Sequence, residues 1–244
     1  MGMGLKIIQN AINDRDEIIA VSPIVDLTQA YGYSRKVYYQ TVFQKDLANV
    51  RDIDVITSRV VYATHIYVAI LFDQHGNIIL QIRNTEKAHN PGKLDKTVGG
   101  HILARDFHDP LWTGTQELMQ ELFIPIISAE PDDFEYRLGI MKNGLTACAF
   151  ATRIDEPKLW WFKKVVGEDT FLAPQILHLN FGLYFGRISA ADNEVGGILF
   201  MPTAIESIEG MFGLKITDDL VQLFEAYPEK IKYFSDLGKS IGAV

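Results

Sequence analysis

The sequence has one cysteine and no long apolar run, and both features exclude classes of protein. Among its 244 residues only Cys148 carries a thiol, so an intrachain disulfide or a cysteine metal cluster is excluded. Because Cys148 lies in the apolar run LTACAFA, we expect it to be a small core residue. No stretch of about 18 uninterrupted apolar residues is present, and the first residues lack the pattern of a signal peptide. We therefore expect a soluble cytoplasmic protein.

Positive charge is also scarce. The 23 Lys and Arg are outnumbered by 31 Asp and Glu, which gives a formal net charge of −8. This balance disfavours binding to a nucleic acid polymer or an anionic membrane, because both need a cationic surface. A small anionic substrate remains compatible with it, since divalent metal ions can supply local positive charge.

The length and the pattern of elements favour one α+β domain spanning residues 1–244. A chain of this length buries a substantial core, and we find no repeat and no convincing linker.

A helix is expected after Asp109, which suits the N-cap, and Pro110, which suits the first helical position; Pro125 would end it. A second helix is expected over 217–238, capped by Thr217. Segment 155–175 has the composition of an irregular, aromatic region. Strands are expected at 16–22, 65–72, 77–83, 97–102, 145–154, 177–190 and 196–203.

The first predicted helix has an apolar and a polar side. A helical wheel places six apolar residues on one side: Leu111, Trp112, Leu118, Met119, Leu122 and Phe123. The opposite side carries Thr113, Gly114, Gln116, Glu117, Gln120 and Glu121. Glu117 and Glu121 are one turn apart, where like charges repel by about 0.2–0.5 kcal/mol. They are either a solvated face or, with carbonyls of the preceding glycine loop, ligands for a hard divalent cation.

These residues resemble a known family, the Nudix hydrolases. The family pattern is Gly, five residues, Glu, seven residues, then Arg-Glu-apolar-any-Glu-Glu-any-Gly-apolar, in a loop–helix–loop. Residues 116–124, QELMQELFI, resemble its second half, and residues 71–102 resemble the strand–turn–strand and PG–GG run that precede it. The resemblance implies an α/β/α sandwich around a mixed sheet. Residues 1–60 would then be an extension and 150–178 an insertion.

The resemblance also implies a metal site. Glu117 and Glu121 match two of the three helix glutamates that hold Mg²⁺ or Mn²⁺ in the family and serve catalysis. Gln120 stands in the third place with a neutral amide. Gly100 matches the glycine that opens the motif, and it or Gly99 would offer a backbone carbonyl to the metal.

The upstream acid and two helix positions depart from the family pattern. Counting forward from Gly100 gives Asp106 as the upstream acid, whereas counting back from the helix gives His108. Gln116 replaces the arginine that supports the acids in the family. Phe123 replaces the glycine that closes the helix.

Other residues are candidates for substrate contact. Arg83, Lys87 and Lys93 surround the NPG turn and, by the resemblance, would lie near the phosphates; alternatively they are surface cations. His101 follows the double glycine, where a related diphosphate isomerase has a metal-binding histidine, although Gly99 replaces the isomerase cysteine. A structural role for His101 under the loop is the alternative.

Two functions are therefore expected as rivals. One is a Mg²⁺- or Mn²⁺-dependent hydrolase that cleaves a diphosphate linkage in a nucleoside diphosphate derivative or similar compound. The other is a catalytically degenerate nucleotide-binding or interaction module with the same fold. Trp160 and Trp161 would either stack on a base or pack an inserted segment against the core. The family resemblance also allows a homodimer.

Overall fold

The protein, described from a computed structural model, falls into two compact units. The structure describes residues 19–24, 38–39, 61–87, 90–129, 149–166, 169–191, 193–203 and 213–242. The first unit comprises residues 1–67, 101–113 and 157–178, and the second comprises 68–100, 114–156 and 179–244. Cys148 and most of the predicted extension 1–60 lie outside the described residues, and the single domain stays a prediction.

The second unit is built on a mixed sheet. Its strands follow the order β11 (Val195–Met201), β4 (Ile78–Arg83), β3 (Val61–Phe72), β10 (Asp169–Leu183), β8 (Ala149–Arg153) and β7 (Ile126–Ala129). Strands β11, β4 and β3 pair antiparallel, whereas β7 and β8 pair parallel. The short β5 (Leu94–Asp95) pairs with β4.

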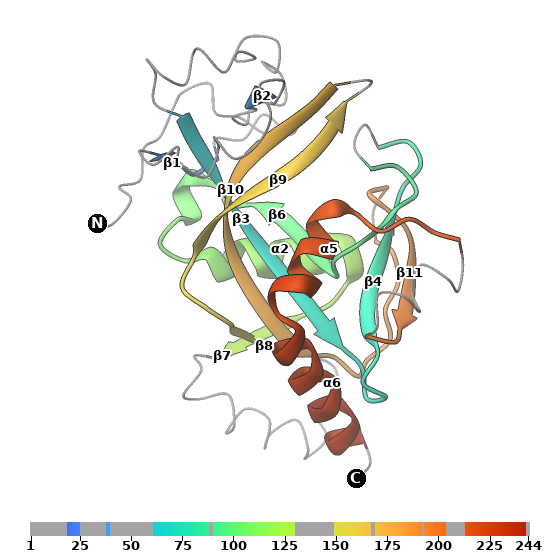
Figure 1. Ribbon diagram of the computed structural model, residues 1–244. Coiled ribbons are helices and arrows are strands. Elements are labelled where there is room, and N and C mark those ends of the chain that lie inside the picture. The colour runs from blue at the N-terminus through green and yellow to red at the C-terminus, as the bar shows by residue number, and fades with distance from the viewer. Residues whose placement is uncertain are drawn as a thin grey trace. The chain divides into compact units, whose positions relative to one another are not determined.

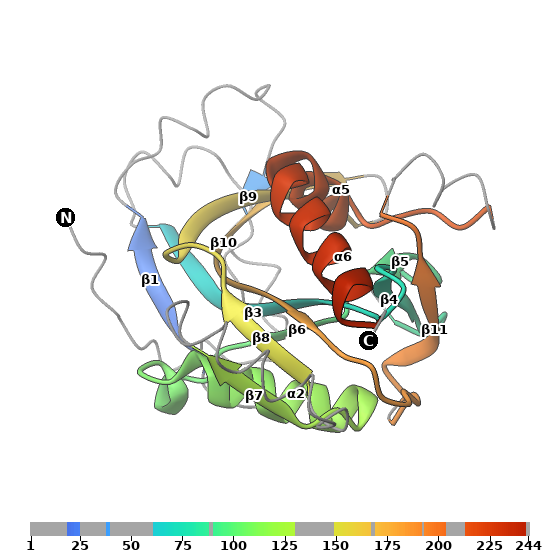
Figure 2. The ribbon, with the colours of Figure 1, turned by 90° about the horizontal axis from the view of Figure 1, so that it is seen from below.

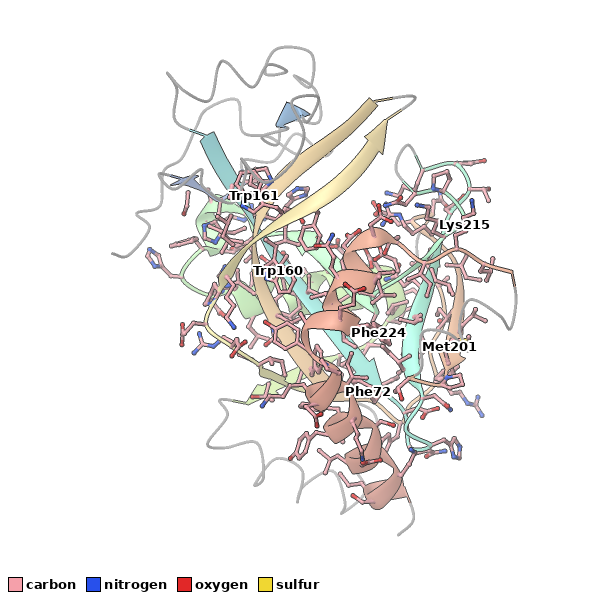
Figure 3. All side chains as sticks on the ribbon, in the orientation of Figure 1. Phe72, Trp160, Trp161, Met201, Lys215 and Phe224 are labelled. Atoms are coloured by element: carbon pink, nitrogen blue, oxygen red, sulfur yellow. The ribbon has the colours of Figure 1, made fainter. Side chains whose placement is uncertain are left out.

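Helices cover both faces of this sheet. Helices α5 (Asp218–Ala226) and α6 (Pro228–Gly242) lie on one face, and α2 (Pro110–Leu122) lies on the other (Figures 1 and 2). Phe72, labelled in Figure 3, stacks on Phe234 of α6 with ring centroids 6.0 Å apart. The predicted α+β sandwich around a mixed sheet is confirmed.

The turn between β3 and β4 is fixed against α6. It reverses at Gly76, whose φ of 74° favours glycine. The Ser235 hydroxyl donates to the Gly76 carbonyl at 2.7 Å. Gly238 lies directly under the Asp73 carbonyl, where an added Cβ would overlap with the carbonyl oxygen. The predicted hairpin is therefore present and docked.

The first unit contains a long hairpin where we expected irregular chain. Strand β9 (Lys158–Val166) pairs antiparallel with β10 from Asp169↔Val166 to Leu177↔Lys158. Segment 155–175 was thus wrongly interpreted as irregular. In β9 the indole of Trp160 stacks on Phe162, with centroids 5.9 Å apart (Figure 3 labels Trp160). This contact favours packing of the aromatic pair over ligand stacking.

The other elements of the first unit are short. Strand β1 (Val21–Ile24) pairs antiparallel with the start of β3, and β2 (Tyr38–Tyr39) pairs parallel with β10. Strand β6 (Val98–His101), which belongs to the second unit up to Gly100, also pairs with β3 and leads to the 3₁₀ helix η1 (Ala104–Asp106) of the first unit.

The C-terminal helix differs from its prediction in two ways. The single helix expected over 217–238 is two helices, α5 and α6, which meet at Tyr227. Thr217 does stand at the N-cap of α5, but its hydroxyl donates to the Asp95 carboxylate at 3.1 Å instead of capping the helix. The strand predicted over 177–190 ends at Leu183. Among the described residues, no helix is long and apolar enough to span a bilayer.

Candidate functional site

The buried side of helix α2 combines an acidic residue with part of the apolar side. Glu121 is buried beside Leu118 and Leu122, while Trp112, Met119 and Phe123 are 50%, 42% and 58% exposed. The buried side of α2 is therefore not the same as its apolar side. The strip of α2 that carries Glu117 and Glu121 faces the sheet, because the Gly100 backbone contacts Glu117 and the Gln81 amide contacts Glu121 there.

The glycine loop lies against this strip. A Cβ added to Gly100 would overlap with the Glu117 carboxylate, so the side chain rests on bare backbone. A Cβ on Gly99 would overlap with the aliphatic end of Lys96. Each glycine therefore permits a charged side chain to approach the backbone closely.

Glu121 is held by an amide from the neighbouring sheet. The Gln81 amide nitrogen donates to the Glu121 Oε2 at 2.6 Å and also to the Thr97 carbonyl at 2.5 Å. The Thr97 hydroxyl donates to the Ile79 carbonyl and accepts from the Leu71 N–H at 2.9 Å. All of these groups are buried, so each hydrogen bond satisfies an atom that water does not reach.

A network of ion pairs joins β4, β5 and α5. The Asp95 carboxylate contacts Arg83 Nη1 at 3.0 Å and Lys96 Nζ at 3.2 Å, and Lys96 also contacts Asp219 at 3.2 Å. Burial opposes ionisation of Asp95, but the Lys96 and Arg83 charges outweigh it and lower its pKa to about 2. Burial opposes the charge of Lys96 as well, yet Asp95 and Asp219 raise its pKa above the ordinary value.

The remaining candidates of the second unit occupy different positions. Gln120 is exposed on α2. Lys87 forms an ion pair with Glu194 at 2.7 Å, which links the turn after β4 to the start of β11. The Lys93 carbonyl accepts the Arg83 N–H at 2.9 Å, which fixes the backbone at the turn.

Two further candidates belong to the first unit. His101 ends β6 and is half-buried. Asp106 ends η1, with one carboxylate oxygen buried 3.7 Å from Arg105 Nε. His108, the other candidate for the upstream acid position, is exposed.

Carboxylate and backbone carbonyl oxygens are the ligands that a hard divalent ion prefers. Within the described ranges, no cluster of three or more His, Cys, Asp or Glu side chains is arranged to hold a metal. Mg²⁺ usually takes one or two protein carboxylates and keeps water or substrate phosphate on its other positions. Glu117, Glu121 and the Gly100 backbone supply donors of that kind.

Sequence reasoning missed Gln81 and Asp95 as parts of this region. A signal was present: Ile79, Gln81 and Arg83 alternate along β4, so their side chains share one face. A glutamine and an arginine on the face of a buried strand need polar partners, and those partners are Glu121 and Asp95.

Comparisons with known proteins give weak structural likenesses. No protein-family model and no curated protein matches the chain. Similar solved structures include DR0079 from Deinococcus radiodurans, with 12% identity over 89% of this chain and 96% of that chain and a TM-score of 0.43. The NUDIX domain of Shewanella oneidensis NrtR complexed with ADP ribose has 13% identity over 78% and 99%, with a TM-score of 0.43.

A third structure contains a metal. It is a bifunctional NMN adenylyltransferase/ADP ribose pyrophosphatase from Francisella tularensis, complexed with AMP and a Mn ion. Identity is 14% over 69% of this chain and 42% of that chain, with a TM-score of 0.39. At these scores the likenesses do not assign a function.

Proposed function

We propose that this protein is a Nudix-type hydrolase that cleaves a diphosphate linkage in a nucleoside diphosphate derivative or a similar compound, using Mg²⁺ or Mn²⁺. The packing of the Glu117 carboxylate on the Gly100 backbone carries the proposal. It brings together the two parts of the motif that the family uses for metal. Glu121, one turn further along α2, faces the same sheet.

In this proposal Glu117 and Glu121 hold the ion, with the carbonyl of Gly100 or Gly99 as a further ligand, and Gln120 is a weaker candidate. When bound, the ion would neutralise phosphate charge and lower the pKa of the attacking water. Because Gly100 has no side chain, substrate oxygens can approach the backbone beside Glu117.

Basic residues of the second unit would orient the phosphates. Arg83 forms an ion pair with Asp95 at 3.0 Å and its side chain is 27% exposed, so solvent and small anions reach the guanidinium. Lys93, at the turn, is the second proposed contact. Ion pairing with Asp95 holds the Arg83 side chain in one orientation, which favours binding of a substrate oxygen at a fixed place.

The test is turnover of nucleoside diphosphate derivatives with Mn²⁺. Glu117→Gln and Glu121→Gln should each abolish turnover, because each removes a full negative charge from the ion's ligands. Glu225→Gln, on the exposed part of α5, is the matched control and should retain the wild-type rate. Equal rates for Glu121→Gln and wild type would remove Glu121 from the mechanism.

The rival proposal is a nucleotide-binding module without turnover. It is motivated by the neutral side chains of Gln116 and Gln120, and by the engagement of Glu121 with Gln81 inside the protein. It predicts that ADP raises the unfolding temperature while no diphosphate is hydrolysed, since ligand binding to the native state alone stabilises it. Turnover of any diphosphate at micromolar enzyme would exclude this rival.

A further inference from the structure

Gln81 connects the sheet to the proposed metal ligand. Its side chain comes from β4, forty positions before Glu121 in the sequence, and both residues are buried. We propose that Gln81 is a positioning residue, which fixes the Glu121 carboxylate for a divalent ion. This inference rests on the proposed function and adds to it the group that sets the ligand's orientation.

The hydrogen bonds determine how the Gln81 amide is oriented. Its nitrogen has two hydrogens, and both are used, one by the Thr97 carbonyl and one by Glu121 Oε2. A flipped amide would place its oxygen against two acceptor oxygens and leave both without a donor. The amide therefore has one favourable orientation, and it directs a hydrogen at one particular carboxylate oxygen.

The acceptor on the other side of the amide is itself fixed. The Thr97 hydroxyl joins the Leu71 N–H on β3 to the Ile79 carbonyl on β4, so Thr97 is tied to two strands. Gln81 thus transmits the position of the sheet to a side chain on α2. A ligand held by a rigid shell of this kind is placed more accurately than one on a free side chain.

The charge of the donor also matters. Asp95 meets two cations, Arg83 and Lys96, which neutralise its charge. Gln81 is neutral, so its hydrogen bond orients the Glu121 carboxylate without cancelling the negative charge that a divalent ion requires. Gln81 and Arg83 are neighbours on one face of β4. Arg83 neutralises the Asp95 carboxylate, whereas Gln81 orients the Glu121 carboxylate and leaves its charge unchanged.

The test is a double-mutant cycle on Mn²⁺ binding, measured by electron paramagnetic resonance on the full chain. Gln81→Met keeps the length of the side chain and removes both donors. We expect it to weaken Mn²⁺ binding by about 10–100-fold, the usual effect of losing a residue that orients a metal ligand. In a Glu121→Gln background the same substitution should have no further effect, because the carboxylate it orients is gone.

Two further variants keep this experiment decisive. Gln81→Asn retains an amide but withdraws it by one methylene, and it should weaken Mn²⁺ binding in the same direction if Gln81→Met does not fold. Gln74→Met, on the exposed turn, is the matched control and should bind Mn²⁺ as the wild type does. Turnover should recover in Gln81→Asn at saturating Mn²⁺, which damage to the fold would not allow.

The outcomes separate this inference from the proposed function. If wild type binds Mn²⁺ and Gln81→Met or a folded Gln81→Asn binds it equally well, the positioning role is wrong and the hydrolase proposal stands. An equal loss with and without the Glu121 carboxylate would also overturn the positioning role. If wild type neither binds Mn²⁺ nor hydrolyses any diphosphate, the proposed function is wrong and the positioning role is lost with it.

Discussion

A buried histidine of the first unit makes the stability of this protein depend on pH. His65 Nε2 lies 2.7 Å from the Ser22 hydroxyl, and its Nδ1 lies 2.9 Å from His178 Nε2. The Phe107 ring packs edge-on against its imidazole at 4.9 Å, and His108 in turn contacts Phe107. Burial lowers the pKa of His65 from 6.5 to about 4. The folded protein therefore holds His65 neutral at pH values where an unfolded chain binds a proton.

The sign and size of the effect follow from this pKa. Stability from neutral His65 is fully present above pH 6.5, is lost as the pH falls, and is gone near pH 4. One pKa unit corresponds to about 1.36 kcal/mol, so the total loss is about 3 kcal/mol. Around pH 5 the unfolded chain carries nearly one extra proton at this site. The free energy of unfolding should then fall by about 1.2 kcal/mol per pH unit.

Urea unfolding between pH 7.5 and 4.5 measures this slope. His65→Gln should flatten it, because the titrating group is removed. His75→Gln, on the exposed turn, should leave it unchanged. The imidazole resonances of His65, followed by NMR, give its pKa directly and do not depend on how a variant folds. A His65 pKa near 6.5, or an unfolding free energy that is constant from pH 7 to pH 5, would refute the reasoning.

Three other substitutions test the packing, each by urea or thermal unfolding. Phe123→Gly should stabilise the protein by about 1 kcal/mol, since Phe123 has a left-handed φ of 55° that glycine adopts more easily. The control Met119→Gly, within the helix, should destabilise it by about the same amount. A loss of stability in Phe123→Gly would contradict this reasoning. Asp95→Asn should destabilise by about 3 kcal/mol because it removes the buried carboxylate that Arg83 and Lys96 both contact, while the exposed Asp236→Asn should change stability much less; similar values for both would be evidence against the network. Gly238→Ala should lower the unfolding temperature, although alanine favours helices, because the added Cβ would overlap with the Asp73 carbonyl. An increase would show that the β3–β4 turn does not pack against α6.

Local patterns in the sequence predicted the elements whose determinants are local. The β3–β4 hairpin follows from two β-rich runs separated by a turn that ends in Gly76. The start of α2 at Pro110 follows from the residues at its N-terminus. Strand β9 was missed because KLWWFKK has no regular polar–apolar alternation. Its pairing with β10 decides its conformation, and that pairing is not visible in β9 alone.

The buried side of α2 could not be predicted from the helix alone. Leu118 and Leu122 of the apolar side are buried, but Met119 of the same side is exposed. The sheet instead offers the Gln81 amide and the bare backbone of Gly100 to Glu121 and Glu117. These partners come from distant positions, and a buried carboxylate is favourable only where they meet it. The burial of Glu121 and the candidate site therefore have the same physical origin.

Phe123 shows how a departure from the family pattern can preserve its geometry. Where the pattern has a glycine, this chain has phenylalanine in the left-handed conformation that glycine adopts most easily. The backbone beyond it still turns back, since the Ile124 N–H donates to the Leu118 carbonyl at 3.1 Å. Loss of the glycine therefore costs conformational strain but does not change the helix end. The neutral residues at 116 and 120 are a different kind of change, because they remove charge. The two proposed functions therefore differ in the negative charge that they require beside Gly100 rather than in the shape of the helix, and measuring Mn²⁺ affinity tests between the two proposals.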